Sequence, residues 1–248
     1  KVGGTAVTAT AAELNGVVQL PGRNLIMNGQ GRINQRTYAS GTATVAANQY
    51  TLDRWRVVTS GQNLSWTGNA ARNVMTAPAG GVEQVVEGLN IVGGTYTINW
   101  TGTATCTVAG VARTKGEAFT LTAATDTTVR FTGGTFTDVQ LELGSIPTTF
   151  DRASHGEELA LCQRYFCKIV SSARFVAAAP THFLVGNLYF PAEMRVIPLL
   201  SVNSVALNSN ATRTLVADST FGGRHQITNS ITGDSADLVV SINADAEL

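Results

Sequence analysis

Alternation of apolar and polar positions dominates residues 24–150. Val139, Leu141 and Leu143, for example, alternate with Gln140 and Glu142, which is the period-two pattern of a half-buried strand. Similar short segments recur throughout this stretch, and Gly-Gly pairs separate several of them. Many short strands without long helices between them predict a β-sandwich or jelly roll.

One helix is predicted over residues 155–168. Ser154 and Glu157 have the spacing of a capping box, in which each side chain bonds a backbone amide at the start of the helix. Leu159, Cys162 and Phe166 then recur at helical spacing. The pattern predicts a helix that links two β-domains.

The predicted fold is all-β: a jelly-roll β-sandwich followed by a short helix and a smaller C-terminal β-domain. We expect an N-terminal connector over 1–22, the jelly-roll domain over 23–153, the linking helix within 154–170 and the β-domain over 171–248. Residues 203–234 are rich in Asn, Ser, Thr and Gly, which predicts exposed loops joining short strands.

The composition limits the classes of binding partner that the chain can be expected to have. Charged residues make up 14% of the 248-residue chain and the formal net charge is +0, so no basic excess indicates nucleic acid or a membrane surface. No apolar run approaches the roughly 20 residues of a membrane span, and no signal-peptide pattern is seen. Cys106, Cys162 and Cys167 lack metal-ligand spacing, and we expect reduced structural thiols, consistent with assembly in a bacterial cytoplasm.

Aromatic residues offer the first candidate site. A sugar binds by stacking its C–H face on an aromatic ring while polar neighbours fix its hydroxyls. The alternative is that Trp55 and Trp100 belong to the core, because Ile98 and Trp100 are two residues apart and share one face of a strand. The candidate glycan-binding residues are Tyr50, Arg54, Trp55 and Trp66.

Two further sites compete with it. The C-terminal loops around Asn208, Asn210, Arg224 and His225 form an alternative receptor contact, because loops on a rigid scaffold often carry binding residues. Asp138 or Glu142 could each supply oxygen ligands to a structural calcium ion, against the simpler interpretation of a solvated strand face.

Catalytic patterns are mostly absent. The sequence has no GxSxG, HExxH or phosphate-loop motif, and its three histidines stand apart. Glu83 and Glu87 could serve a glycosidase as an acid pair, but a chain with 17 acidic residues supplies such pairs by chance. We therefore expect no enzyme and no catalytic residues.

Five segments follow one another along the chain: NLIMNGQGRINQR (24–36), YTLDRW (50–55), GGTYTINWTG (93–102), ELGSIPTTFDR (142–152) and EELALCQRYF (157–166). Together they resemble the carbohydrate-binding-type jelly-roll module of bacteriophage tail fibre and tail-associated proteins. The chain departs from that family at Gln30–Arg32, where the family usually carries an aromatic or acidic residue. The opening AVTATAAELNGV and the ending INADAEL are also similar to phage structural proteins.

The resemblance implies a virion tail fibre protein that contributes to host attachment by binding cell-surface glycan, without catalysis. Its partners would be itself as a homotrimer, bacterial surface polysaccharide or lipopolysaccharide, and other virion tail proteins, with no nucleic acid and no membrane insertion. Its location would be the tail of the virion, and no cofactor beyond the structural calcium is expected. The alternatives are a purely structural fibre or decoration module, or a glycan depolymerase.

Overall fold

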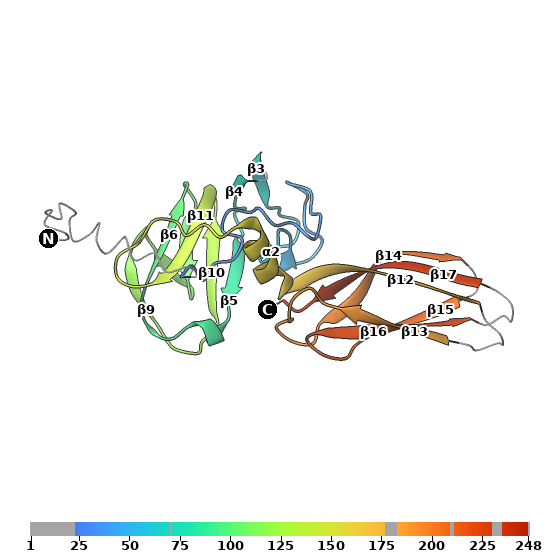
Figure 1. Ribbon diagram of the computed structural model, residues 1–248. Coiled ribbons are helices and arrows are strands. Elements are labelled where there is room, and N and C mark those ends of the chain that lie inside the picture. Colours follow the sequence, from blue (N-terminus) through green and yellow to red (C-terminus); the bar gives the residue numbers. More distant parts are fainter. Residues whose placement is uncertain (1–22, 70, 177–182, 209–210, 230–234, 248) are drawn as a thin grey trace, which may run out of the picture. The chain divides into compact units, whose positions relative to one another are not determined.

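A computed structural model describes residues 23–69, 71–176, 183–208, 211–229 and 235–247. The expected connector over 1–22 and the candidate Asn210 lie outside this range. The protein is mostly β, with 43% of residues in strands and 7% helical, and its sheets are antiparallel (Figure 1). The chain divides into two compact units: unit 1 comprises 1–32, 38–51 and 55–155, and unit 2 comprises 33–37, 52–54 and 156–248.

Unit 1 contains two antiparallel sheets. They are accompanied by a short 3-10 helix, η1 (Gly88–Asn90). The six-stranded sheet has the order β1 (Gln49–Tyr50), β2 (Arg56–Val57), β5 (Val82–Val86), β10 (Thr127–Thr132), β7 (Thr105–Val108) and β8 (Val111–Arg113). The five-stranded sheet has the order β3 (Ser65–Asn69), β4 (Arg72–Thr76), β11 (Thr135–Leu143), β6 (Gly94–Thr101) and β9 (Ala118–Leu121).

An aromatic cluster holds the two sheets of unit 1 together. Phe131 of β10 stacks on Phe136 of β11 with centroids 4.6 Å apart. Trp100 of β6 meets Phe131 edge-on at 5.4 Å, and Trp55 meets Phe136 at 5.3 Å. Ile98 and Trp100 are both buried, so the prediction that they share a core face is confirmed. Such aromatic contacts stabilise a core beyond the area they bury.

A tight turn separates Tyr50 of β1 from Arg56 of β2. The amide of Thr51 donates to the carbonyl of Trp55 at 2.9 Å, and Arg54 between them has a φ of 70°. A left-handed residue ends the alternation of a strand, so Arg54 and Trp55 do not occupy successive strand positions.

Unit 2 contains one α-helix and two three-stranded antiparallel sheets. The helix α2 (His155–Gln163) begins where the capping box predicts it. One sheet has the order β12 (Phe166–Val176), β17 (Ser235–Asp245), β14 (Leu199–Asn208). The other has the order β13 (Phe183–Tyr189), β16 (Gly222–Asn229), β15 (Ala211–Ala217).

Two expectations about this region are wrong. The helix ends at Gln163 rather than 168, because Phe166 and Cys167 pair with Asp245 and Ala244 of β17 and so begin a strand. Residues 203–234 are mostly strands rather than loops, since β14, β15 and β16 fill much of this stretch. Antiparallel pairing satisfies the backbone of Asn- and Thr-rich segments as well as that of apolar ones, so composition alone misjudged them.

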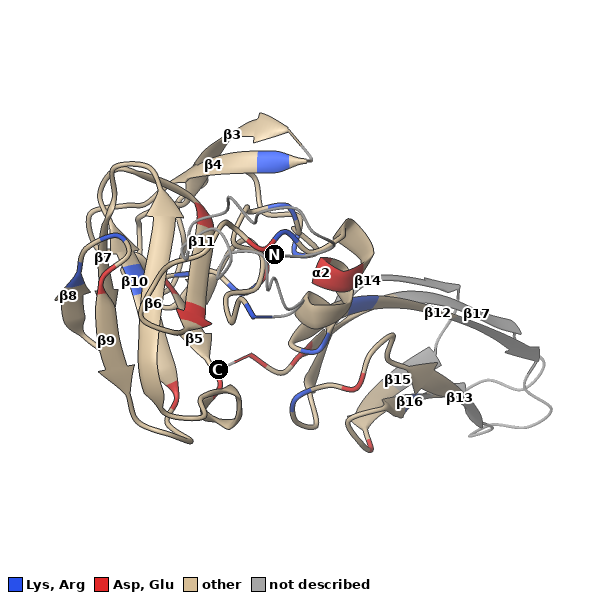
Figure 2. Ribbon diagram, turned by 60° about the vertical axis from the view of Figure 1, so that its left-hand side comes forward, with Lys and Arg blue, Asp and Glu red and all other residues tan. Residues whose placement is uncertain are grey.

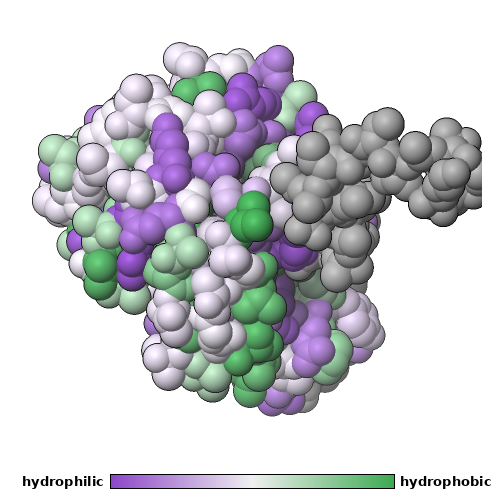
Figure 3. All heavy atoms as spheres, turned by 90° about the vertical axis from the view of Figure 1, so that its left-hand side faces the viewer, coloured by the Kyte–Doolittle hydropathy of each residue, from purple (hydrophilic) through white to green (hydrophobic). Residues whose placement is uncertain are grey.

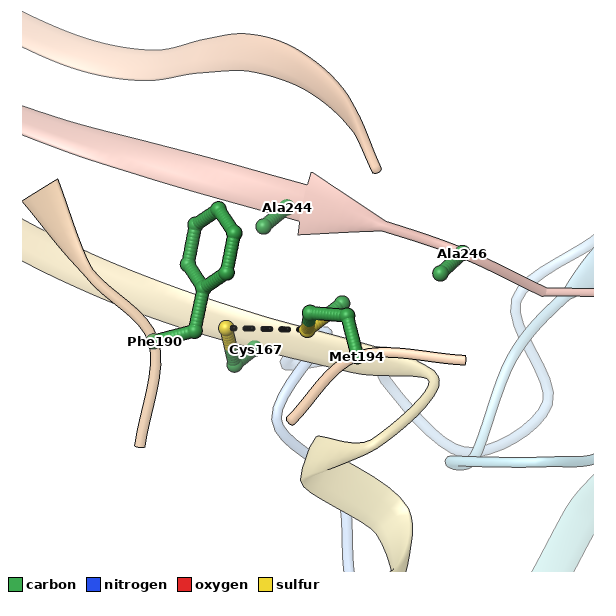
Figure 4. Close-up of a cluster of buried hydrophobic side chains, with 5 residues drawn as sticks. All are labelled: Cys167, Phe190, Met194, Ala244 and Ala246. Atoms are coloured by element: carbon green, nitrogen blue, oxygen red, sulfur yellow. Dashed lines mark hydrogen bonds between the residues drawn. The ribbon is translucent and has the colours of Figure 1, made fainter. Parts of the chain in front are cut away.

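The described core of unit 2 includes a small apolar cluster. Cys167 and Met194 face each other, with their sulfurs 3.9 Å apart (Figure 4). Phe190, Ala244 and Ala246 complete the cluster. Cys167, Cys106 and Cys162 are all buried and none of them forms a disulfide, as expected of structural thiols.

Candidate functional site

Two of the four predicted glycan contacts are buried. Trp55 has no exposed surface, and its indole N–H donates to the carbonyl of Asn28 at 3.0 Å. Arg54 is 1% exposed, bonds Glu247 and lies over the ring of Tyr165. Neither side chain offers a surface to a sugar, so we remove both from the candidate set. The alternative prediction, that Trp55 belongs to the core, is confirmed.

The other two predicted contacts belong to different sheets. Tyr50 lies on β1 of the six-stranded sheet, whereas Trp66 lies on β3 of the five-stranded sheet. Trp66 is half-buried, and its ring lies 6.0 Å from that of Tyr38 in a tilted arrangement. The ring that packs against Trp66 is therefore that of Tyr38, which was not among the predicted contacts.

The C-terminal candidates also do not form a cluster. Asn208 ends β14, whose other end, Leu199, is nine residues away. At about 3.3 Å per residue the two ends lie roughly 30 Å apart. Arg224 lies on β16, three residues after Phe221. The carbonyl of Phe221 accepts a hydrogen bond from the amide of Phe190, which belongs to the small apolar cluster. Arg224 pairs with Asp218 at 3.5 Å, and His225 is a neighbouring strand residue rather than part of a loop.

The predicted calcium ligands are engaged by protein groups. Asp138 accepts hydrogen bonds from Arg72 and, at 2.6 Å, from Gln30. Burial disfavours its ionisation, but these hydrogen bonds outweigh burial, and the pKa of Asp138 lies below its ordinary value. Glu142 is buried and accepts from Thr148. Within the described residues no group of three or more His, Cys, Asp or Glu could hold a metal, and no helix is long and apolar enough to cross a membrane.

A groove lies on the outer face of the six-stranded sheet of unit 1. In β10, Val129 and Phe131 face the core, so Thr128, Arg130 and Thr132 face outward. Charged residues are sparse over this unit (Figure 2). The groove has a volume of about 590 Å³ and is lined by Arg56, Glu83, Thr107, Ala109, Gly110, Asp126, Thr128, Arg130 and Thr132. We call it the outer groove.

Strand register places the charged residues of the outer groove in one row. Arg56 of β2 lies opposite Glu83 of β5, and Glu83 lies opposite Arg130 of β10. Thr107 of β7 follows on the far side of Arg130, and Tyr50 of β1 lies opposite Arg56. Because neighbouring strands are about 4.8 Å apart, directly opposed side chains are in contact.

Glu83 is held between the two arginines. Its Oε1 accepts a hydrogen bond from Nε of Arg56 at 2.9 Å and lies 2.7 Å from Nη2 in the same ion pair. Its Oε2 accepts a hydrogen bond from Nε of Arg130 at 2.7 Å and lies 2.6 Å from Nη2 of that arginine. The Glu83 side chain is 3% exposed, while those of Arg56 and Arg130 are 21% and 40% exposed. A carboxylate whose oxygens each accept a charge-assisted hydrogen bond from a different arginine is held in one orientation.

A glycine makes room for Arg130. Gly81, immediately before β5, has a φ of +97°, and a Cβ built there would lie 2.9 Å from Cδ of Arg130. The stem of Arg130 therefore packs over Gly81, and the guanidinium is fixed from two sides, by this packing and by Glu83. A guanidinium fixed in this way loses little side-chain entropy when it binds a ligand.

The outer groove can recognise a polar ligand. It presents two guanidinium groups and three threonine hydroxyls on a rigid sheet, and hydroxyls both donate and accept hydrogen bonds. Sequence reasoning missed this set. The outward alternation of Thr128, Arg130 and Thr132 was a usable signal, but nothing in the sequence shows that β2, β5 and β10 are neighbours.

Compared with models of known protein families, with curated proteins and with solved structures, the chain gives no match.

Proposed function

We propose that this protein is a tail fibre protein of a bacteriophage virion that contributes to host attachment by binding bacterial surface glycan through the outer groove. The observation that carries the binding part of the proposal is the row of Arg56, Glu83 and Arg130 among threonine hydroxyls. A fixed, partly exposed polar row on a rigid sheet suits a polyhydroxylated ligand, because few side chains must be ordered when it binds.

The proposal that the protein belongs to a virion is supported by the sequence motifs, which resemble those of phage tail proteins and occur in the same order along the chain. The two antiparallel sheets of unit 1 are compatible with the jelly roll of that family, and we propose this topology for unit 1. Other virion tail proteins, and bacterial polysaccharide or lipopolysaccharide, are the proposed partners, and no catalytic step is included.

A homotrimer is part of the proposal. Unit 2 exposes large apolar side chains that a single copy leaves in water, among them Leu199 at 76%, Val170 at 71% and Phe221 at 62%. Apolar residues also reach the surface as separate green patches in Figure 3. Burial of such side chains between copies would stabilise an assembly, and repeated weak glycan sites would gain avidity from it.

The test is binding to bacterial cells and to an array of bacterial surface polysaccharides. The test variant is Glu83→Gln with Arg130→Gln, which removes the centre of the outer groove without changing net charge. The matched control is Asp138→Asn with Arg72→Gln, which removes an ion pair from the five-stranded sheet. We expect the test variant to lose binding while the control retains it.

Three results would contradict the proposal. A correctly folded protein that binds neither cells nor any polysaccharide would be a structural fibre or decoration module. Equal binding by both double variants would place the site elsewhere. Release of reducing ends from capsule or lipopolysaccharide would identify a glycan depolymerase.

A further inference from the structure

The centre of the outer groove carries an excess positive charge. Arg56 and Arg130 share one carboxylate, Glu83, so this row keeps one net positive charge. The groove's other acid, Asp126, precedes Arg130 by four residues, which is about 13 Å along an extended strand. Asp126 therefore lies towards one end of the groove rather than opposite Arg130, and its carboxylate accepts a hydrogen bond from the amide of Gly88 at 2.6 Å.

Arg130 has donors left for a ligand. Its Nε donates to Oε2 of Glu83 at 2.7 Å, and its Nη2 lies 2.6 Å from the same oxygen in the ion pair. A guanidinium has five N–H groups, so the N–H groups of Nη1, on the end of the guanidinium away from this contact, can still bond a ligand. The side chain is 40% exposed, so an anion can reach this end.

Stacking is not what the outer groove offers. None of its nine lining residues is aromatic. Tyr50 lies next to Arg56 at the end of the row, with its ring 5.9 Å from the guanidinium carbon. A neutral sugar depends on stacking for much of its affinity, whereas a charged sugar gains from charge-assisted hydrogen bonds to arginine.

Building on the proposed function, we infer that the outer groove selects an acidic sugar residue, with its carboxylate or phosphate group on the free end of Arg130. Thr128 and Thr132 lie two positions to either side of Arg130 on the same outward face, and Thr107 lies opposite it. The hydroxyls of Thr128 and Thr107 are placed to bond the ring hydroxyls of a sugar whose anionic group is held at Arg130, and that of Thr132, which already bonds the hydroxyl of Thr105 at 2.7 Å, retains a lone pair for one further bond. Asp126 repels an anion at its end of the groove and so favours one orientation.

The inference is tested by calorimetric titration with paired probes. One pair is oligogalacturonate and the same oligosaccharide after reduction of its carboxyl groups. The other is dextran phosphate and unmodified dextran. We expect at least one acidic probe to bind about tenfold or more tightly than its neutral counterpart, since a hydrogen bond to a charged group is worth at least this factor. The preference should fall as salt is raised.

Arg130→Gln should reduce the preference to within about twofold, while Glu83 keeps its bond to Arg56 and the fold is retained. Arg130→Lys should give an intermediate preference, because it keeps the charge but loses the planar fork. The control is Arg72→Gln, which removes one positive charge from an equally exposed arginine, at 44%, on the five-stranded sheet. It should leave the preference unchanged.

The outcomes separate this inference from the proposed function. Tighter binding of the acidic probe than of its neutral counterpart, in the carboxylate pair, the phosphate pair or both, supports the inference and identifies which anionic group is recognised. Neutral glycans bound as tightly as acidic ones, with binding lost in Glu83→Gln/Arg130→Gln, would overturn the inference and leave the proposed function intact. Equal losses in Arg130→Gln and Arg72→Gln would overturn it as non-specific attraction. Absence of binding to all four probes and to cells would overturn both.

Discussion

Removing the carboxylate of Glu247 should strongly destabilise unit 2. The side chains of Glu247 and Arg54 are 4% and 1% exposed, and they form a buried ion pair. Arg36 also approaches Glu247, at 3.5 Å. Glu247→Ala leaves the Arg54 guanidinium buried over Tyr165 without its counter-charge. Breaking a buried pair by removing one partner costs about 3–5 kcal/mol, so we expect a loss of this size.

The assay must report on unit 2. All three tryptophans lie in unit 1, so tryptophan fluorescence does not follow unit 2. Hydrogen exchange of peptides from β12 and β17 does, and a loss of 3–5 kcal/mol corresponds to roughly a hundredfold to several-thousandfold lower protection. The control is Asp218→Ala, which breaks a pair with Arg224 whose side chains are 47% and 55% exposed. Such a surface pair contributes about 0–1 kcal/mol.

A second variant tests the electrostatic reason for the loss. Arg54→Met with Glu247→Leu removes both charges and keeps apolar volume, and such replacements of buried pairs are often neutral. We expect this double variant to be markedly more stable than Glu247→Ala. The reasoning is refuted if Glu247→Ala costs no more than Asp218→Ala, or if the double variant is as unstable as Glu247→Ala.

Three further results are expected. Trp55→Ala should lower the free energy of unfolding of unit 1 by about 3–5 kcal/mol, because it leaves a cavity in the aromatic cluster. Urea unfolding monitored by the fluorescence of the remaining tryptophans measures this loss, and a loss below about 1 kcal/mol would contradict the prediction. Burial raises the pKa of Cys106 to about 12, so a thiol reagent at pH 8 should label it only after unfolding. Because the pKa of Asp138 is lower in the folded protein than its ordinary value of 3.8, the ionised carboxylate stabilises the fold at pH values above 3.8. The stability advantage of wild type over Asp138→Asn should therefore disappear as the pH falls through the folded pKa. A difference in stability that does not change with pH would contradict this.

Much of the local structure follows from the sequence. The capping box at Ser154 and Glu157 predicts the start of α2, and the spacing of Ile98 and Trp100 predicts a shared core face. These features depend on residues within a few positions of each other, where period and capping chemistry are sufficient. The end of α2 was misjudged because Phe166 and Cys167 also suit a helix, and pairing with β17, almost 80 residues later, decides for a strand.

The candidate site lay beyond sequence reasoning for the same reason. The sequence established a β-rich chain of low charge, and the alternation around Arg130 was a signal that sequence reasoning did not use. Only the tertiary structure brought Arg56 and Arg130 to the two sides of Glu83, 27 and 47 residues away, and showed that Trp55 and Arg54 are buried. Alternation determines which face a side chain takes, but the order of strands in a sheet determines its neighbours, and that order is set by packing of the whole core.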